Sequence, residues 1–220
     1  MFMCNFFIFI GLVTVSTGVL KSLYETSLIR LLGWSSMIHI GHIILSIGIG
    51  TAESYLASFF YLIVYLFLQL FSYIFILSFY VHEGGYIGYL DNISNIRYIY
   101  ASSKWFTICF VSIILSMNGL PFFAGFFSKW YILVAVLETK GYVMAITLFL
   151  LNCIGLVYNL RLIRYLFMVE GDTLEMEKFI KLEGKPLIRL LLIMVVLLNM
   201  FFFLLHPYLY MYLKILILGI

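Results

Sequence analysis

The chain has 220 residues, of which 65% are hydrophobic and 10% are charged. An ordinary soluble domain carries about 25% charged residues. A soluble fold of this length has too little interior for so much apolar surface, so the composition excludes a soluble globular enzyme, a disordered chain and a nucleic-acid-binding protein. The net charge of +3 gives no reason to expect a polyanionic partner. We therefore expect a polytopic membrane protein that contacts lipids.

Hydrophobic stretches of about 20 residues, the length that crosses a bilayer as a helix, recur along the chain. In chain order they cover residues 2–20, 31–50, 55–81, 104–138, 142–168 and 186–205. Residues 169–185 are expected to form a polar surface loop. Residues 186–220 are expected to form a final helix, with Pro186 in its first turn, and a C-terminal tail. The predicted fold class is all-α, with about six transmembrane helices.

The fourth stretch is interrupted at Gly119, Leu120 and Pro121, so it forms either one broken pass or two short ones. The positive-inside rule separates these alternatives, because Lys and Arg gather on one side of the membrane. One broken pass places ten cations on one face and two on the other, whereas two passes split them six against six. The ten are Lys21, Arg30, Arg97, Lys104, Arg161, Arg164, Lys178, Lys181, Lys185 and Arg189, and the two are Lys140 and Lys214. The count favours one helix broken at 119–121, and an N-terminus on the less basic face.

Lys129 is the one cation that this count assigns to neither face, because it lies inside the broken span. A lysine in the middle of a bilayer costs about 2.5–3.5 kcal/mol on the most lenient insertion scale. Broken helices line ion sites in transporters, and a neighbouring charge can switch a buried lysine between its charged and neutral forms. We therefore predict that Lys129 transfers protons. The alternative is a lysine that snorkels or has a purely structural partner.

Three further polar side chains lie within apolar spans and are candidate members of a proton relay. His39 and His42 are three residues apart, so they share a helix face, and imidazole titrates near neutral pH. Gln69 is the strongly polar side chain in the middle of the third span and can hold water or join helices. For the two histidines, burial with structural hydrogen bonds is an equal alternative. The chain has no CxxC pair and no phosphate-binding loop, so neither a metal nor a nucleotide site is expected.

Three segments of the chain read RLLGWSSMIHIGH (30–42), GLPFFAGFFSKWYIL (119–133) and IGLVYNLR (154–161). In order and spacing they resemble the KRLLAYSSxxHxGY, GxPPxxGFxxKWxIL and IGLYYYLR stretches of the antiporter-like membrane subunits of complex I, NADH:ubiquinone oxidoreductase. Within that family the resemblance is closest to the subunit 2 type. The subunit 4 type has Glu where Lys129 stands, and in the subunit 5 type Asp usually follows the lysine, where this chain has Trp130.

The resemblance implies two inverted five-helix repeats, each with one broken helix, of which residues 1–168 match the second. Lys129 matches the family's lysine on the second broken helix, which is implicated in proton transfer. His39 matches the family's histidine, and His42 stands where Tyr or Trp is usual. The expected role is half of a proton channel in a membrane-arm subunit of an H⁺-translocating NADH:ubiquinone reductase. NADH, FMN, iron–sulfur clusters and ubiquinone are expected elsewhere in the complex, and this chain is expected to bind no cofactor or metal.

The first repeat has no counterpart in these 220 residues. We expect a split subunit whose first half is a separate chain, packed against the helices at 2–20 and 31–50. Neighbouring antiporter-like and small membrane-arm subunits are further expected partners. The abundance of Phe, Tyr, Ile and Leu over Ala and Pro is typical of AT-rich organelle genomes, which favours the mitochondrial inner membrane with the basic loops in the matrix. Two alternatives remain: a multi-subunit cation/proton antiporter subunit, and a structural subunit whose relay has decayed.

Overall fold

The computed structural model describes residues 2–83, 86–89, 92–96, 99–100, 104–167, 180–182 and 186–218. Seven helices build its body: α1 (Phe2–Tyr24), α2 (Leu28–Ile49), α3 (Ala52–Leu77), α5 (Lys104–Asn118), α6 (Ala124–Glu138), α7 (Tyr142–Phe167) and α9 (Pro186–Leu218). The smaller elements are strands β1 (Phe79–Glu83), β2 (Tyr86–Tyr89) and β3 (Ile180–Leu182), and the short helix η1 (Ile93–Ile96).

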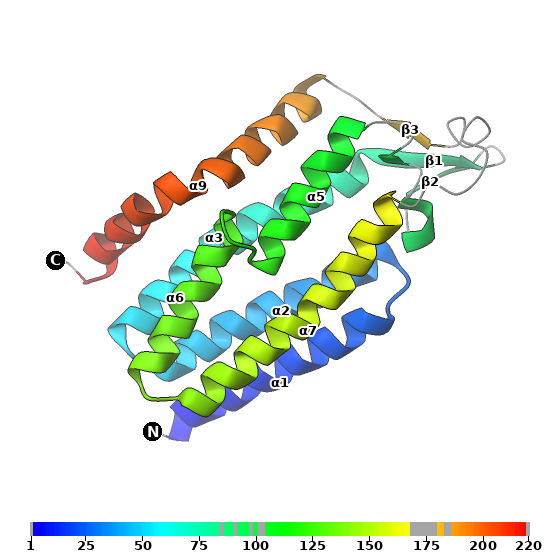
Figure 1. Ribbon diagram of the computed structural model, residues 1–220. Helices are drawn as coiled ribbons and strands as arrows, with labels where there is room; N and C mark the ends of the chain where they lie inside the picture. The colour runs from blue at the N-terminus through cyan, green and yellow to red at the C-terminus, as the bar shows by residue number, and fades with distance from the viewer. Residues whose placement is uncertain are drawn as a thin grey trace.

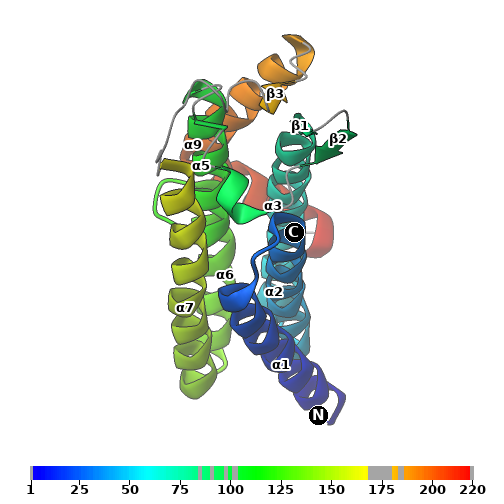
Figure 2. The same cartoon turned by 90° about the vertical axis from the view of Figure 1, so that its right-hand side faces the viewer.

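The helices form two layers, and successive passes of the chain run in opposite directions (Figures 1 and 2). In the turned view of Figure 2, α1, α2 and α3 form one layer and α5, α6 and α7 the other. Both chain ends lie at one end of the bundle, and the strands lie at the opposite end (Figure 1). Helix α5 runs from the strand end to the middle of the bundle, and α6 continues in the same direction to the other end. Together they make one interrupted pass.

Four helices are long and apolar enough to cross a membrane: α1, α2, α3 and α7. A fifth span is α9, whose segments Ile193–Phe202 and Leu204–Ile217 meet at 76°. Pro207 explains the bend, because its ring clashes with the carbonyl four residues earlier, at position 203, and its nitrogen has no hydrogen to donate. By length and composition the described chain thus has four spanning helices, or five with the bent α9, and the α5–α6 pair stands where the broken pass is expected. The predicted polytopic helical fold is confirmed.

Two of the predicted element boundaries are wrong. Helix α3 ends at Leu77 rather than 81, because the backbone from Phe79 onward finds its partners in a sheet. In that antiparallel sheet β1 is the central strand, and Tyr80 lies opposite Tyr89 on β2 and Lys181 on β3. The two long linkers are thereby joined, so the all-α body has a small β-sheet at one end. Most of the predicted polar loop, residues 169–179 and 183–185, lies outside the described residues.

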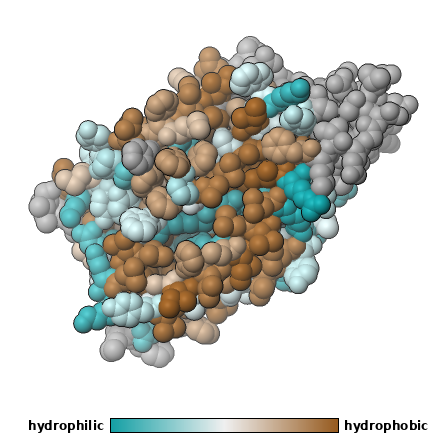
Figure 3. Space-filling model, in the orientation of Figure 1, coloured by the Kyte–Doolittle hydropathy of each residue, from teal (hydrophilic) through white to brown (hydrophobic). Residues whose placement is uncertain are grey.

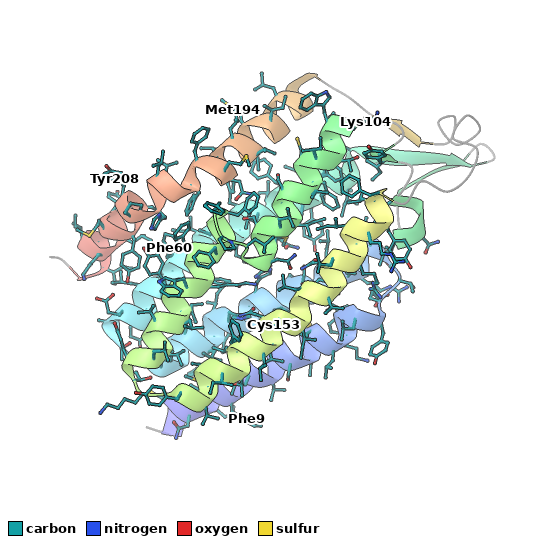
Figure 4. The ribbon with its side chains drawn as sticks, in the orientation of Figure 1. Phe9, Phe60, Lys104, Cys153, Met194 and Tyr208 are labelled. Carbon is teal, nitrogen blue, oxygen red and sulfur yellow. The ribbon has the colours of Figure 1, made fainter. Side chains whose placement is uncertain are left out.

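The second wrong boundary is at the C-terminus. The predicted last helix stops at residue 205 and gives way to a tail, but α9 continues through Pro207 to Leu218. A proline inside a membrane helix is tolerated where neighbouring helices supply packing. Here α9 packs against α3, α5 and α6, and Phe60 of α3 lies at the centre of this contact (Figure 4). The Phe60 ring touches Tyr131 of α6 and Phe202 and Tyr210 of α9.

Small residues set the spacing between α1 and α2. A Cβ added at Gly11, Gly18, Gly41 or Gly48 would lie within 3 Å of atoms of the opposite helix. In a bilayer, where the lipid is as apolar as the side chains, such close backbone contact drives helix association. The outer faces of the helices remain apolar. In the most apolar 18-residue segment of α1, and also of α7, only 22% of the residues are buried, so most of the segment faces outward; for α2 the share is 56%. Figure 3 shows hydrophobic side chains over most of one face, with hydrophilic ones near both ends and in a narrow central strip.

Candidate functional site

The break between α5 and α6 begins with a hydrogen-bonded helix end. Gly119 has a φ of 78°, the left-handed conformation that glycine adopts without strain. Its N–H donates to the carbonyl of Ser116 at 2.8 Å, and the N–H of Leu120 donates to the carbonyl of Leu115 at 3.3 Å. These two bonds are a Schellman motif, which satisfies carbonyls that a helix end otherwise leaves unpaired. The carbonyl of Asn118 remains for another donor.

Lys129 supplies that donor. Its Nζ donates to the carbonyl oxygen of Asn118 at 3.0 Å, across one and a half turns of α6 and the break. The ammonium group therefore lies at the C-terminal end of α5, where the partial negative charge of the helix dipole stabilises a cation. The lysine stem passes close to Gly119, where an added Cβ would lie 2.9 Å from the lysine Cδ. The sequence favoured a broken helix here, and the structure shows that the break itself holds the lysine.

An asparagine pair extends this contact to α7. The Asn159 amide of α7 donates to the side-chain oxygen of Asn118. The amide nitrogen of Asn118 is buried and has no hydrogen-bond partner among the described residues. Both ion pairs of the described chain lie away from this site, at Arg30–Glu25 and Lys214–Glu53. In the described part of the chain, the partner of Lys129 is therefore a backbone carbonyl rather than a carboxylate.

His39 lies on the same cavity as Lys129. The cavity encloses about 10 Å³, and its lining includes Tyr61, Tyr65 and Ser128 as well as these two residues. The Nδ1 of His39 is 2.7 Å from the hydroxyl of Tyr61, and its ring stacks on Tyr65 with centroids 4.9 Å apart. A cavity of this size admits at most one water molecule, and Lys129 and His39 are polar members of its mostly apolar lining. The structure thus brings two of the four predicted site residues together.

The other two predicted site residues lie beside this cavity rather than on it. His42 stacks on Tyr61, and its Nδ1 is 2.8 Å from the carbonyl of Ile38. That bond places a proton on Nδ1, and Asn152 of α7 is a side-chain hydrogen-bond partner of the ring. Gln69 donates to the carbonyl of Leu32 at 3.4 Å, which joins α3 to α2. Neither side chain is among the described residues that line the cavity.

Asn199 of α9 is the site residue that sequence reasoning missed. Its Oδ1 accepts a hydrogen bond from the hydroxyl of Ser116 at 2.8 Å and another from the N–H of Ala124 at 3.2 Å. Its Nδ2 donates to the carbonyl of Ser112 at 3.3 Å. The available signal was weak: an asparagine within an otherwise apolar stretch, 190–205, of the last helix. Sequence alone does not say which helix that asparagine faces.

Arg161 of α7 forms hydrogen bonds at the end of α1, away from the Lys129 site. Its two terminal nitrogens donate to the carbonyls of Ser22, Leu23 and Glu25, where α1 ends. These carbonyls have no partner within α1, so the guanidinium group acts as a cap from a distant helix. The cavity beside it, about 160 Å³, is also lined by Asn92.

The Glu25 carboxylate stabilises the same linker. Burial opposes its charge, but the N–H of Ser27, the indole N–H of Trp34 at 3.3 Å and the charge of Arg30 outweigh that effect. Together they lower the pKa of Glu25 below its ordinary value. The linker between α1 and α2 is thus a hydrogen-bonded turn that lies at the basic end of the molecule.

The described fold and site define a class of protein: a polytopic helical membrane subunit with an antiporter-like broken helix whose lysine lies at the break. A family model described as "NADH:quinone oxidoreductase/Mrp antiporter, TM" matches residues 1–155. The chain therefore belongs to this family of NADH:quinone oxidoreductase and Mrp antiporter transmembrane subunits.

Individual relatives agree with this assignment. The NADH-quinone oxidoreductase subunit N of Azoarcus sp. is 30% identical over 171 residues, which are 74% of this chain and 34% of that protein. A chain of respiratory complex I from Thermus thermophilus has the same fold, with a TM-score of 0.73, 21% identity and 92% of this chain covered, against 45% of that chain. A chain of the Mrp complex from Dietzia sp. also has this fold, with a TM-score of 0.64 and 18% identity. The match covers 77% of this chain and 31% of that chain. This chain spans about a third of the length of its curated sequence relatives.

Proposed function

We propose that this chain is part of the membrane arm of a respiratory complex I of the subunit 2 type, and that Lys129 carries a proton across the middle of the membrane. The observation that carries the proposal is the placement of its Nζ, 3.0 Å from the Asn118 carbonyl and on the same cavity as His39. Sequence relatives named NADH-quinone oxidoreductase subunit N and subunit 2 support the choice of complex.

The geometry explains how Lys129 can hold a proton inside a membrane. The carbonyl of Asn118 and the C-terminal end of the α5 dipole stabilise the ammonium form, which hydrocarbon alone would not. Since this stabilisation is modest, a charge that approaches or leaves from a neighbouring subunit can shift the lysine between its two forms. Moving one charge across 100 mV requires about 2.3 kcal/mol, which is within the reach of such a change.

His39 provides the second station of the proposed relay. Its ring bonds to the Tyr61 hydroxyl on one side and borders the cavity on the other, so one water molecule there can connect it to Lys129. His42 is a further candidate, because its ring stacks on Tyr61, whose hydroxyl bonds to His39. Quinone reduction in other subunits would supply the energy, and NADH, FMN, the iron–sulfur clusters and ubiquinone would bind there. This chain itself carries out no redox step.

Proton counting in the assembled complex tests the role of Lys129. We expect Lys129→Ala to lower the number of protons moved per NADH oxidised, in proteoliposomes, while the complex still assembles and still reduces quinone. Lys140→Ala is the matched control, because Lys140 is exposed at a helix end. An assembled Lys129→Ala complex that translocates protons at the wild-type ratio would show that the lysine is structural and that its relay has decayed.

A cation/proton antiporter subunit is the second candidate, because the family model covers both kinds of protein and the Mrp chain has the same fold. It would use the same lysine without redox partners. Affinity purification of the chain from its native membrane separates the candidates. Flavin and iron–sulfur absorbance in the purified assembly supports complex I, whereas an assembly without them that exchanges Na⁺ for protons supports the antiporter.

We further propose that a separate polypeptide supplies the first repeat and packs against α1 and α2. Large apolar side chains on the outer faces of these two helices support this proposal; they include Met3, Phe9, Val13, Met37 and Ile40. The intact mass of the chain and cross-linking from cysteines placed on α1 provide the test. A mass that includes a first repeat on the same polypeptide would overturn the split. The proposed location is the mitochondrial inner membrane, with the basic end in the matrix.

A further inference from the structure

Helix α6 begins without a cap of its own. Its N-cap residue is Phe123, whose side chain offers no hydrogen-bond acceptor, so the first N–H groups of α6 need partners from elsewhere. In a membrane interior water cannot supply them, and an unsatisfied N–H is costly. Two of these groups are satisfied by other helices: Ala124 donates to Asn199 of α9, and Gly125 donates to the hydroxyl of Ser116 of α5 at 3.2 Å.

Asn199 closes this arrangement into a network. Its side chain is 1% exposed and bonds to both sides of the break: to Ser112 and Ser116 on α5, and to Ala124 on α6. Its oxygen and its nitrogen both have partners, so a carbon side chain of the same size leaves at least two buried polar groups of the break unpaired. The fit is close, because a Cβ added at Gly125 would overlap the carbonyl of Ser116.

The register of the two half-helices decides where Lys129 points. The lysine extends from α6, whereas its acceptor, the carbonyl of Asn118, is the last one of α5. A shift of α6 by a fraction of a turn would move Nζ out of hydrogen-bond distance from that oxygen. Whatever fixes α6 against α5 therefore fixes the contact of the lysine, and the structure assigns this task to a residue 70 positions further along the chain.

We propose that Asn199 is the positioning residue of the Lys129 site: the last helix caps α6 in trans and sets the register of the broken helix. The proposal deepens the proposed function and rests on it for the consequence of misplacing the lysine. It makes α9 part of the proton site rather than a peripheral span. Asn199 acts through Ser116 and Ala124 and does not itself carry the proton.

Three variants of the intact complex test this proposal. Asn199→Leu removes the network with little change in side-chain size. Asn199→Asp in its neutral form keeps an acceptor and a donor in the same place. Ser22→Ala is the control, because it removes a buried hydroxyl that bonds within its own helix, on α1. The two readouts are hydrogen–deuterium exchange of the 119–130 segment and the pH profile of proton translocation.

We expect Asn199→Leu to speed exchange at Ala124 and Gly125 by about tenfold or more, to lower translocation and to displace its pH profile. Asn199→Asp should restore both readouts, and Ser22→Ala should change neither. If Asn199→Leu does not assemble, Ser116→Ala opens the same network from α5 and should give the same pattern. Wild-type exchange of this segment in Asn199→Leu, or in Ser116→Ala where only that variant assembles, overturns the proposal.

The two proposals fail in different ways. If Lys129→Ala leaves translocation unchanged, the proposed function fails, and exchange together with the distance from Lys129 Nζ to the Asn118 oxygen in a cryo-EM map of Asn199→Leu still decides the placement. If Lys129→Ala lowers translocation but Asn199→Leu has wild-type exchange and a wild-type pH profile, the lysine functions and Asn199 does not position it.

Discussion

Gly119 and Lys129 depend on each other at the break. The left-handed conformation of the glycine allows the Schellman bonds that end α5, and its missing side chain leaves room for the lysine stem. A bulkier residue would act on the helix end and on the lysine at the same time. The motif that carries the family resemblance thus has a local physical reason for the order of its residues.

We expect Gly119→Ala to destabilise the protein by about 1–2 kcal/mol, because an L-residue is strained at positive φ, and to displace the side chain of Lys129 as well. Thermal unfolding in detergent and proton translocation measure the two effects. Gly33→Ala is the matched control: Gly33 lies in the second turn of α2, an added Cβ there has nothing within 4 Å, and alanine favours a helix. Equal unfolding temperatures for the two variants would contradict this reading of the break.

The sequence revealed a site residue only where the pattern that marks it lies close to it along the chain. Lys129 was found because a cation within an apolar span is rare, and His39 because two histidines share a helix turn. The acceptor of Lys129 is a backbone oxygen, and Asn199 is 70 residues from the lysine that it serves. Neither leaves a pattern in the sequence, since both contacts depend on how the helices pack in three dimensions.

At the scale of elements, three helix ends are completed by side chains of other helices. Lys129 of α6 caps the end of α5, Asn199 of α9 caps the start of α6, and Arg161 of α7 caps the end of α1. Helix α3, by contrast, begins with its own capping box between Thr51 and Ser54. Side chains of neighbouring helices thus supply hydrogen-bond partners that these helix ends lack, so polar contacts at the ends help to fix how the helices pack.

Arg161→Met tests this principle away from the proton site. The change keeps a long apolar stem but leaves the carbonyls of Ser22, Leu23 and Glu25 without their charged donor. Charge-assisted hydrogen bonds contribute about 1.5–3 kcal/mol each, so we expect a clear fall in the unfolding temperature in detergent. Arg164→Met, one turn further along α7 at an exposed position, is the control and should change it little. Similar falls for both variants would show that the loss of charge alone matters.

Hydropathy predicted the polytopic helical fold but not every boundary of its helices. The strands were missed because β1 and β3 pair across about 100 residues, a distance over which short polar linkers give no signal. The end of the last helix was placed too early, because His206 and Pro207 read as a stop. Packing of Tyr210 against Tyr131 of α6, with ring centroids 4.1 Å apart, instead holds the helix together beyond the proline.

At the scale of the whole molecule, the charge asymmetry follows the helix directions. The turn between α1 and α2 and the start of α5 at Lys104 lie toward the strand end of the bundle, and the turn between α6 and α7 lies at the end that carries both termini (Figures 1 and 4). The positive-inside rule therefore predicts that the strand end faces the compartment from which the chain is inserted. The small sheet should then extend from that side of the membrane.

Single cysteines test this orientation. In a variant without Cys4, Cys109 and Cys153, we expect Lys21→Cys and Lys140→Cys to react with a membrane-impermeant maleimide from opposite sides of sealed vesicles. Both positions are exposed, so neither depends on unfolding for access. Labelling of both from the same side would require α5 and α6 to cross the membrane separately and would overturn the six-pass topology.

The choice of a main-chain oxygen as the partner of Lys129 has a genetic consequence. Every amino acid at position 118 carries a carbonyl, so no codon change there can delete the acceptor, although it can still loosen the contact to Asn159. Loss-of-function alleles should instead collect at Lys129, at Gly119 and at Asn199, where a single base change alters the charge, the backbone or the cap. The oxygen atom that Lys129 contacts thus cannot be removed by a substitution at its own position. The contact can still be lost through a substitution at Asn199 in the last helix.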